Sequence, residues 1–319
     1  MERRSLGKSE INVAPLTFGG NVFGWTLDEK QSFEILDGFR DYGFNFIDTA
    51  DVYSRWAPGN EGGESETIIG KWMKERGNRQ EVVIATKVGG DMGEGRTLSR
   101  KHISQSVEGS LRRLQTDYID LYQSHYDDPQ IPQEEILETY LQLVKEGKVR
   151  LIGASNFSKE RLAQSLDISE RNSYPMYQTL QPLYNLYDRK AFEDELEAYC
   201  IENSIGVINY YALASGFLSG KYRSEDDLHK SARGAGNKKY LNKRGFAILS
   251  ALDEVADRHH STPASIAIAW LLARPSVTAP IASATNLEQL KSLVHATELK
   301  LDSHSIELLD KASDWKTDV

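Results

Sequence analysis

Four polar residues stand at or just beyond the ends of short apolar runs, where they could meet at one edge of a sheet. The run FNFID ends at Asp48 and leads into Tyr53. The runs VVIATK and IDLYQSH end at Lys87 and His125. A carboxylate, a phenol, an ammonium group and an imidazole gathered at one point form a site that handles protons. Each residue alone has an ordinary structural explanation, but the convergence of all four favours a catalytic site.

The expected chemistry is transfer of a proton from Tyr53 to a carbonyl oxygen. A tyrosine phenol has a pKa of about 10 and is a weak acid at neutral pH. The Lys87 ammonium group is expected to lower that pKa, and Asp48 is expected to keep Lys87 charged and oriented. His125 is expected to donate a hydrogen bond that polarises the same oxygen. This set contains no electrophile or hydride donor, so a cofactor must supply it.

The chain around these positions alternates between short apolar runs and longer amphipathic segments. The expected strands are Leu16–Gly19, Phe44–Asp48, Val82–Thr86, Ile119–Ser124, Leu151–Ser155, Tyr177–Leu180, Gly206–Tyr210 and Ala279–Ser283. The expected helices are Asp28–Tyr42, Glu64–Lys74, Ser99–Leu114, Gln133–Glu146, Ser158–Leu166, Arg189–Asn203, Pro263–Ala273 and Asn286–Thr297. This alternation predicts parallel strands joined by helical crossovers, and eight such repeats close a (β/α)8 TIM barrel. A doubly wound fold needs a G-x-G-x-x-G turn after an early strand, and the sequence contains none.

Two segments fall outside the repeat. Arg3–Leu6 and Ile11–Val13 flank Gly7-Lys8-Ser9, which predicts an N-terminal β-hairpin across the floor of the barrel. A long loop between strands 7 and 8, from Ala212 to Thr262, predicts a cover over a ligand and an extra helix near Phe246–His259. No linker or shift in composition divides the chain, so residues 1–319 are expected to form a single domain.

The composition excludes several classes of function. The 319 residues carry 38 basic and 47 acidic side chains, a net charge of −9, so we expect neither nucleic acid nor a membrane as a partner. The single cysteine, Cys200, forms no intramolecular disulfide, and the charged N-terminus is unlike a signal peptide. We therefore expect a cytoplasmic monomer or small homo-oligomer. No metal is expected, since a metal-dependent barrel hydrolase built on Asp48 or His125 needs further histidine and acidic ligands at strand ends.

Six separated segments resemble the aldo-keto reductase superfamily. They are FIDTADVYSRWAPGNEGGESETIIG, TK at the end of the third strand, DLYQSH, GKVRLIGASNF, LQPLYNLYDR and INYYALASGFLSGKY. The resemblance runs from about Leu6 to Leu301 and is closer to the non-classical branch, with its bacterial reductases and potassium-channel β subunits, than to the aldose reductases. It implies an aldo-keto reductase barrel that transfers a hydride from NADPH, with NADH also possible, to a small-molecule aldehyde or ketone.

The resemblance also implies roles for individual residues. The catalytic tetrad corresponds to Asp48, Tyr53, Lys87 and His125, with Tyr53 as general acid. Contacts to the nicotinamide correspond to Ser155, Asn156 and Gln181 at its carboxamide and Tyr210 beneath its ring. The loop over the pyrophosphate corresponds to Leu213, Gly216, Leu218, Gly220 and Lys221, and the adenosine end to Ser283, Thr285 and Gln289.

Two departures from the family pattern bear on these details. Thr285 stands where many relatives carry Arg or Lys against the 2′-phosphate of NADP, so the choice between NADPH and NADH stays open. Tyr211-Ala212 replaces a common Ser-Pro, which is expected to alter loop shape rather than chemistry. Four basic residues of the long loop could replace the missing cation: Arg233, Lys238, Lys239 and Arg244.

Other interpretations remain open from the sequence. A sensing or interaction subunit, like the channel-associated relatives, would bind the same cofactor and turn over slowly, although the complete tetrad favours catalysis. Ser155 and Asn156 could instead cap the following helix, and Tyr210 could be an ordinary strand-end aromatic. Three aromatic residues near the expected mouth either line a substrate pocket or pack the loops: Trp25, Trp56 and Tyr126.

Overall fold

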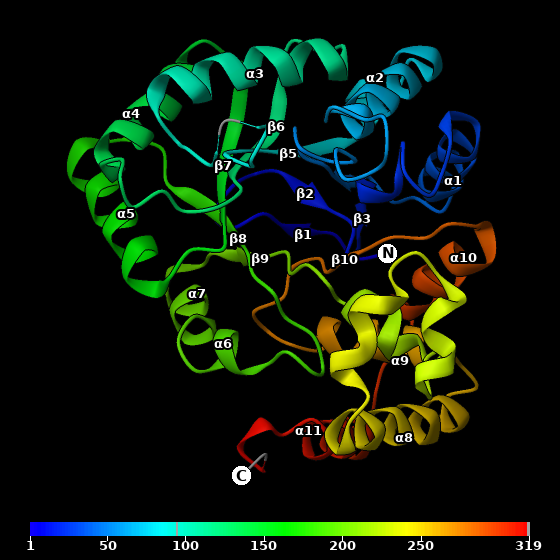
Figure 1. The fold of residues 1–319 in the computed structure, drawn as a ribbon. Helices are drawn as coiled ribbons and strands as arrows, with labels where there is room; N and C mark the ends of the chain where they lie inside the picture. Colours follow the sequence, from blue (N-terminus) through cyan, green and yellow to red (C-terminus); the bar gives the residue numbers. More distant parts are fainter. Residues whose placement is uncertain (94, 318–319) are drawn as a thin grey trace.

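The computed structural model describes residues 1–93 and 95–317 and contains eight parallel strands that curl around a common axis (Figure 1). They are β3 (Thr17–Gly19), β4 (Phe46–Asp48), β5 (Val83–Val88), β6 (Ile119–Ser124), β7 (Val149–Ser155), β8 (Tyr177–Gln181), β9 (Gly206–Val207) and β10 (Ile281–Ala282). Their order in the sheet is β10-β3-β4-β5-β6-β7-β8-β9. Between β9 and β10 the Thr278 amide donates to the Val207 carbonyl at 2.8 Å, and Ile281 donates to Asn209 at 2.9 Å. These bonds close the ring, and the expected (β/α)8 TIM barrel is confirmed.

Helices surround the ring, and several of them begin at a capping side chain. They are α1 (Glu29–Asp41), α2 (Glu64–Arg76), α3 (Arg100–Leu114), α4 (Gln133–Lys145), α5 (Lys159–Asn172), α6 (Lys190–Glu193), α7 (Glu197–Asn203), α9 (Pro263–Leu272) and α10 (Leu287–Ala296). Asp28, Ser99, Ser158 and Thr262 each accept a hydrogen bond from a first-turn amide, which stabilises the helix start. Outside the ring, α8 (Lys243–Arg258) and α11 (Ser303–Ala312) lie side by side (Figure 1).

The predicted hairpin crosses the floor of the barrel. Its strands β1 (Arg4–Ser5) and β2 (Asn12–Val13) pair antiparallel and lie across the centre of the ring in Figure 1. Gly7, between them, has φ +59°, and a Cβ there would lie 2.3 Å from the Gln178 carbonyl oxygen, so only glycine fits this turn. The hairpin and the barrel strands pack together in one apolar cluster. Its buried members are Leu6, Ile11, Val13, Phe46, Val83, Ala85, Leu121, Ile208 and Ala279.

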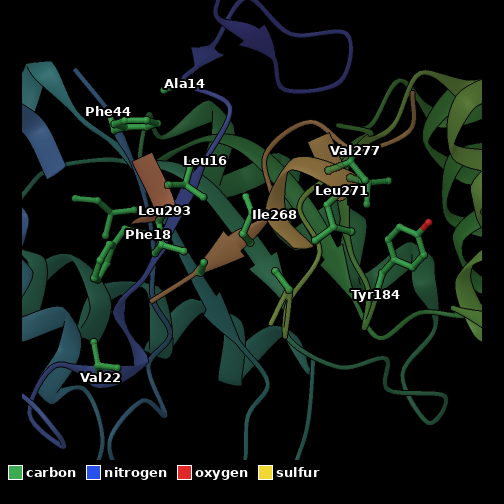
Figure 2. Packing of buried hydrophobic residues seen from close by; sticks show 14 of the residues in the cluster. Ala14, Leu16, Phe18, Val22, Phe44, Tyr184, Ile268, Leu271, Val277 and Leu293 are labelled. Atoms are coloured by element: carbon green, nitrogen blue, oxygen red, sulfur yellow. The ribbon is translucent and has the colours of Figure 1, made fainter. Parts of the chain in front are cut away.

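A second, larger core fills the space between the strands and the helices. Figure 2 shows Phe18 of β3 beside Leu293 of α10, with Leu16 just before β3 and Ile268 of α9 nearby. Burying side chains of this size contributes about 1.5–3 kcal/mol each. Apolar side chains therefore pack on both faces of the barrel wall. This packing fixes the strand ends, and the polar residues stand there.

Several expected boundaries were wrong, for physical reasons. β8 ends at Gln181 and β10 begins at Ile281 because Pro182 and Pro280 have no N–H for the ladder. The expected helix Arg189–Asn203 is split into α6 and α7, whereas α5 runs on to Asn172, past the expected end. The C-terminal helix α11 was not predicted. The extra helix in the long loop is confirmed as α8.

Candidate active site

The structure brings the four proton-handling residues to one end of the barrel. Asp48 ends β4, Lys87 lies in β5, and His125 directly follows β6. Tyr53 lies in the loop after β4, in which Ser54 has φ +74° and donates its hydroxyl to the Phe23 carbonyl. The side chains meet at the carboxyl ends of the strands, which is where active sites of such barrels lie.

Lys87 is the centre of the cluster. Its side chain is fully buried, and its Nζ donates to Asp48 Oδ2 at 2.6 Å, to the Thr49 carbonyl at 2.8 Å and to the Tyr53 phenol oxygen at 3.0 Å. An ammonium group has three protons, so all its donors are used. Burial lowers the pKa of Lys87, while the carboxylates of Asp48 and Asp51 oppose this change.

Asp48 is held on its other side by two glutamines. Its Oδ1 accepts hydrogen bonds from Gln123 Nε2 at 3.1 Å and from Gln181 Nε2 at 2.9 Å. These bonds join β4 to β6 and β8 and fix the carboxylate that faces Lys87. The sequence analysis missed Gln123. The signal for it was a polar residue inside an apolar strand, two positions before His125, on the same side of the strand pleat.

The pKa of the Tyr53 phenol differs from the expectation. Burial and, next, the Asp48 carboxylate raise the pKa of Tyr53 well above its usual value, so the expected lowering by Lys87 was wrong for this structure. The physical reason is that Asp48 neutralises the Lys87 charge while burial disfavours the phenolate. Because its oxygen accepts the Lys87 bond, Tyr53 keeps its own proton free to donate.

His125 lies beside Tyr53 as a neutral ring. The two rings are 6.1 Å apart, and His125 stacks on Tyr126 at 4.8 Å with an interplanar angle of 14°. Burial, followed by the positive charges of Lys87 and Arg96, lowers the pKa of His125 well below its usual value. A neutral imidazole carries one N–H and can donate a single hydrogen bond to an oxygen at the mouth. His125 Nδ1 is buried without a hydrogen-bond partner among the described residues.

The residues expected at the nicotinamide form a connected chain next to the tetrad. Ser155 donates to the Gln181 carbonyl at 2.8 Å, and Asn156 Nδ2 donates to the His125 carbonyl at 2.9 Å. The Tyr210 hydroxyl donates to Asn156 Oδ1 at 2.9 Å, which aligns its ring beside the site. Asn156 adopts φ +57°, a strained backbone state of the kind often found at functional sites. The contacts of these residues to a cofactor remain predictions.

The segment expected over the pyrophosphate is also strained. It forms the short helix η3 (Ala214–Ser219), in which Ala214, Ser215 and Gly216 have φ of +46°, +57° and +91°. The amides of Ala214 and Gly216 donate to the carbonyls of Tyr211 and Leu213 at 2.7 and 2.8 Å, so the contacts of this segment to a pyrophosphate remain predictions. The Leu218 side chain is fully buried, so only its backbone can face a ligand. The other members of this predicted set border η3: Leu213, Gly220 and Lys221.

The residues expected at the adenosine end lie near the start of α10. Thr285 donates from its amide to Gln289 Oε1 at 2.9 Å and from its hydroxyl at 3.1 Å. Ser283 donates to the Gly19 carbonyl at 2.7 Å and contacts Asn21 at 2.8 Å. With its amide oriented to satisfy its neighbours, Asn21 accepts from Arg233 Nη2 at 2.6 Å.

Of the four basic loop residues, Arg233 is the one that lies beside the residues expected at the adenosine end. Its guanidinium lies 5.2 Å from the Trp25 ring, next to Asn21. Lys238 pairs with Glu225 on the surface. Elsewhere on the loop, Lys239 lies over Tyr240 and Arg244 over Tyr187. Sequence spacing cannot separate these four residues, because the path of the long loop decides which one faces inward.

Within residues 1–93 and 95–317, no three His, Cys, Asp or Glu side chains are grouped so that they could hold a metal ion. No helix in the same ranges is long and apolar enough to span a membrane.

Comparison with known proteins now gives the family. The model of the Aldo/keto reductase family matches residues 15–314. The chain belongs to the aldo/keto reductase family. This aldo/keto reductase is 36% identical over 318 residues to the uncharacterized oxidoreductase YrpG of Bacillus subtilis strain 168, covering 97% of this chain and 95% of that relative.

Two further relatives are named as a reductase and as a potassium-channel subunit. The aldo-keto reductase YhdN of the same bacterium is 36% identical, covering 92% of this chain and 87% of its own. A probable voltage-gated potassium channel subunit beta of Arabidopsis thaliana is 33% identical, covering 94% and 92%. Together these comparisons make the chain an oxidoreductase of a family that binds nicotinamide cofactors, and they confirm the resemblance to bacterial reductases and channel β subunits.

Proposed function

We propose that this protein reduces an aldehyde or ketone to an alcohol, using NADPH or NADH and Tyr53 as the general acid. The observation that carries the proposal is the Lys87 hydrogen bond to the Tyr53 oxygen at 3.0 Å, because it leaves the phenolic proton free for a substrate. The neutral His125 beside it supplies a second donor for the same oxygen.

The described residues fit a nicotinamide dinucleotide. Tyr210 offers an aromatic ring beside the tetrad, and Lys221 next to η3 offers a positive charge for a pyrophosphate. A Cβ on Gly216 would lie 3.2 Å from Lys221 Nζ, so this ammonium group lies against the backbone of the loop. Bound at this site, the reduced nicotinamide would supply the hydride.

The chain's own residues would handle the oxygen of the carbonyl group. Tyr53 and His125 donate hydrogen bonds to it and favour negative charge there. As the carbonyl carbon gains the hydride, the oxygen takes the Tyr53 proton, which completes the alcohol. Lys87 then donates its hydrogen bond to the phenolate oxygen, and Asp48, fixed by Gln123 and Gln181, keeps Lys87 in place.

The proposal includes a small-molecule carbonyl substrate, a cytoplasmic setting and a monomer or small homo-oligomer, without nucleic acid or membrane. The alternative is a slow cofactor-binding subunit, which the channel-related names of some relatives favour.

One assay separates the two functions. Purified protein is mixed with para-nitrobenzaldehyde and NADPH or NADH, and loss of the reduced cofactor is followed by absorbance. We expect multiple turnovers, at about 1 s⁻¹ or faster, typical of metabolic enzymes. Saturable cofactor binding with no more than a single slow turnover would instead support the sensing subunit. Absence of both would contradict both functions.

A further inference from the structure

The walls of the mouth around Tyr53 are aromatic. The Trp56 ring lies edge-on to Tyr53 at 5.8 Å and to Trp25 at 5.7 Å, and Trp56 remains half exposed. On the other side, Tyr126 stacks on His125. These faces suit a substrate with a flat or apolar body next to its carbonyl group.

An arginine adds a positive charge to the same wall. The Arg96 guanidinium lies 3.7 Å from the centre of the Tyr126 ring, and its charge contributes to the lowered pKa of His125. Arg96 is exposed, and over residues 1–93 and 95–317 it makes no side-chain hydrogen bond or ion pair. The next arginine along the chain, Arg100, pairs with Glu138. The guanidinium of Arg96 is thus positioned by an aromatic face and keeps its donors.

A second cation lies against the same loop. Arg55 Nη1 donates to the Asp91 carbonyl oxygen at 3.2 Å rather than to a carboxylate. The Asp91 carboxylate accepts from the amides of Gly93 and Gly95 at 2.8 and 3.1 Å, and after these bonds the charges of Arg55 and Arg96 also lower its pKa. Among the described residues, this part of the rim therefore carries two arginines beside one carboxylate, in a protein whose net charge is −9. A local positive field of this kind favours an anionic substrate.

We infer that the substrate is an aromatic or apolar carbonyl compound with a carboxylate remote from the carbonyl group, and that Arg96 binds that carboxylate. This inference rests on the proposed function. A guanidinium fits a carboxylate through paired, charge-assisted hydrogen bonds, and Tyr126 holds its plane. The carbonyl group then lies at Tyr53 and His125, while the aromatic body packs between Trp56 and Tyr126.

The test compares an anionic with a neutral aldehyde. They are para-carboxybenzaldehyde and methyl para-formylbenzoate, which share the benzaldehyde body. The ester group withdraws more electron density from the carbonyl group than the carboxylate does, so the acid-to-ester ratio of kcat/KM is compared between protein variants, where this difference cancels. We expect the ratio to be about fivefold higher in the wild type than in Arg96→Gln, since an exposed ion pair contributes a factor of about five at most. Added salt should reduce this ratio, because Arg96 is exposed.

Three variants assign the preference to its residue. Arg96→Gln should lower the acid-to-ester ratio about fivefold, and Arg96→Lys, which keeps the charge but not the planar guanidinium, should lower it less. Arg100→Gln, a nearby surface change, should leave the ratio as in the wild type. An acid-to-ester ratio that is the same in Arg96→Gln as in the wild type would overturn the inference and leave the reductase function standing. Reduction of neither aldehyde would contradict the proposed function, and the inference with it.

Discussion

At the scale of single residues, Asp51 is the unusual group beside the tetrad. It is 2% exposed, and neither carboxylate oxygen has a hydrogen-bond partner among the described residues. Burial, followed by the charge of Glu66, raises the pKa of Asp51 from 3.8 to about 7, although Arg113 and Lys87 oppose this change. The folded protein therefore holds a proton on Asp51 between about pH 4 and 7 that the unfolded chain releases.

This difference predicts a pH-dependent effect of Asp51→Asn. As pH rises from about 4 to 7, the wild type should lose stability relative to the variant, by up to about 4 kcal/mol, and the difference should be constant above pH 7. Urea unfolding of both proteins at pH 5 and pH 8 measures it. Asp226→Asn, an exposed aspartate, is the control and should show no such change. A stability difference that is equal at both pH values would contradict the assigned ionisation.

The convergence of three of the four proton-handling residues was predictable from the sequence, because each of the three lies at or next to the end of its own strand. Asp48, Lys87 and His125 need only the positions of strand ends to be brought together. Gln123 and Arg233 were not assigned, because their roles depend on contacts across the barrel. The pKa of Tyr53 also depends on burial, which residue types alone do not give.

At the scale of elements, η3 is the segment whose backbone shape should control cofactor binding. Gly216 has φ +91°, and a β-branched residue there costs about 1–2 kcal/mol in backbone strain alone. We expect Gly216→Val to weaken NADPH binding by about tenfold or more, as measured by fluorescence titration. Its control is Gly236→Val in the neighbouring helix η5 (Gly234–Tyr240), where a Cβ meets nothing within 4 Å. Unchanged affinity in the Gly216 variant would exclude η3 from the cofactor site.

Elements were predicted well where local pattern decides and poorly where distant contacts decide. The amphipathic helices and their serine and threonine caps are local features. The break between α6 and α7 directly follows Glu193, whose carboxylate accepts from Arg189, and Arg189 also donates to Ser313 near the other end of the chain. Ser313 directly follows α11, which the sequence analysis also missed. Such pairings across the barrel leave no periodic signal in the sequence.

At the scale of the whole molecule, the alternation of strands and helices was sufficient to predict the barrel. Segments far apart in the sequence close the barrel and form its floor. The Ile281 amide donates to the Asn209 carbonyl, and the hairpin packs on the barrel strands. Because this frame is fixed from both faces, the strand ends hold the tetrad in position. We therefore expect Tyr53 to be positioned as an acid at the mouth of the barrel before a substrate binds.

The most direct measurement of this central claim is the turnover of Tyr53→Phe beside its affinity for NADPH and NADH. The variant keeps the ring but loses the phenolic proton. We expect cofactor affinity close to that of the wild type and a kcat with para-nitrobenzaldehyde lower by a factor of about 10²–10⁴, the usual contribution of a general acid. Turnover near the wild-type rate would contradict the assignment of Tyr53 and the mechanism built on it.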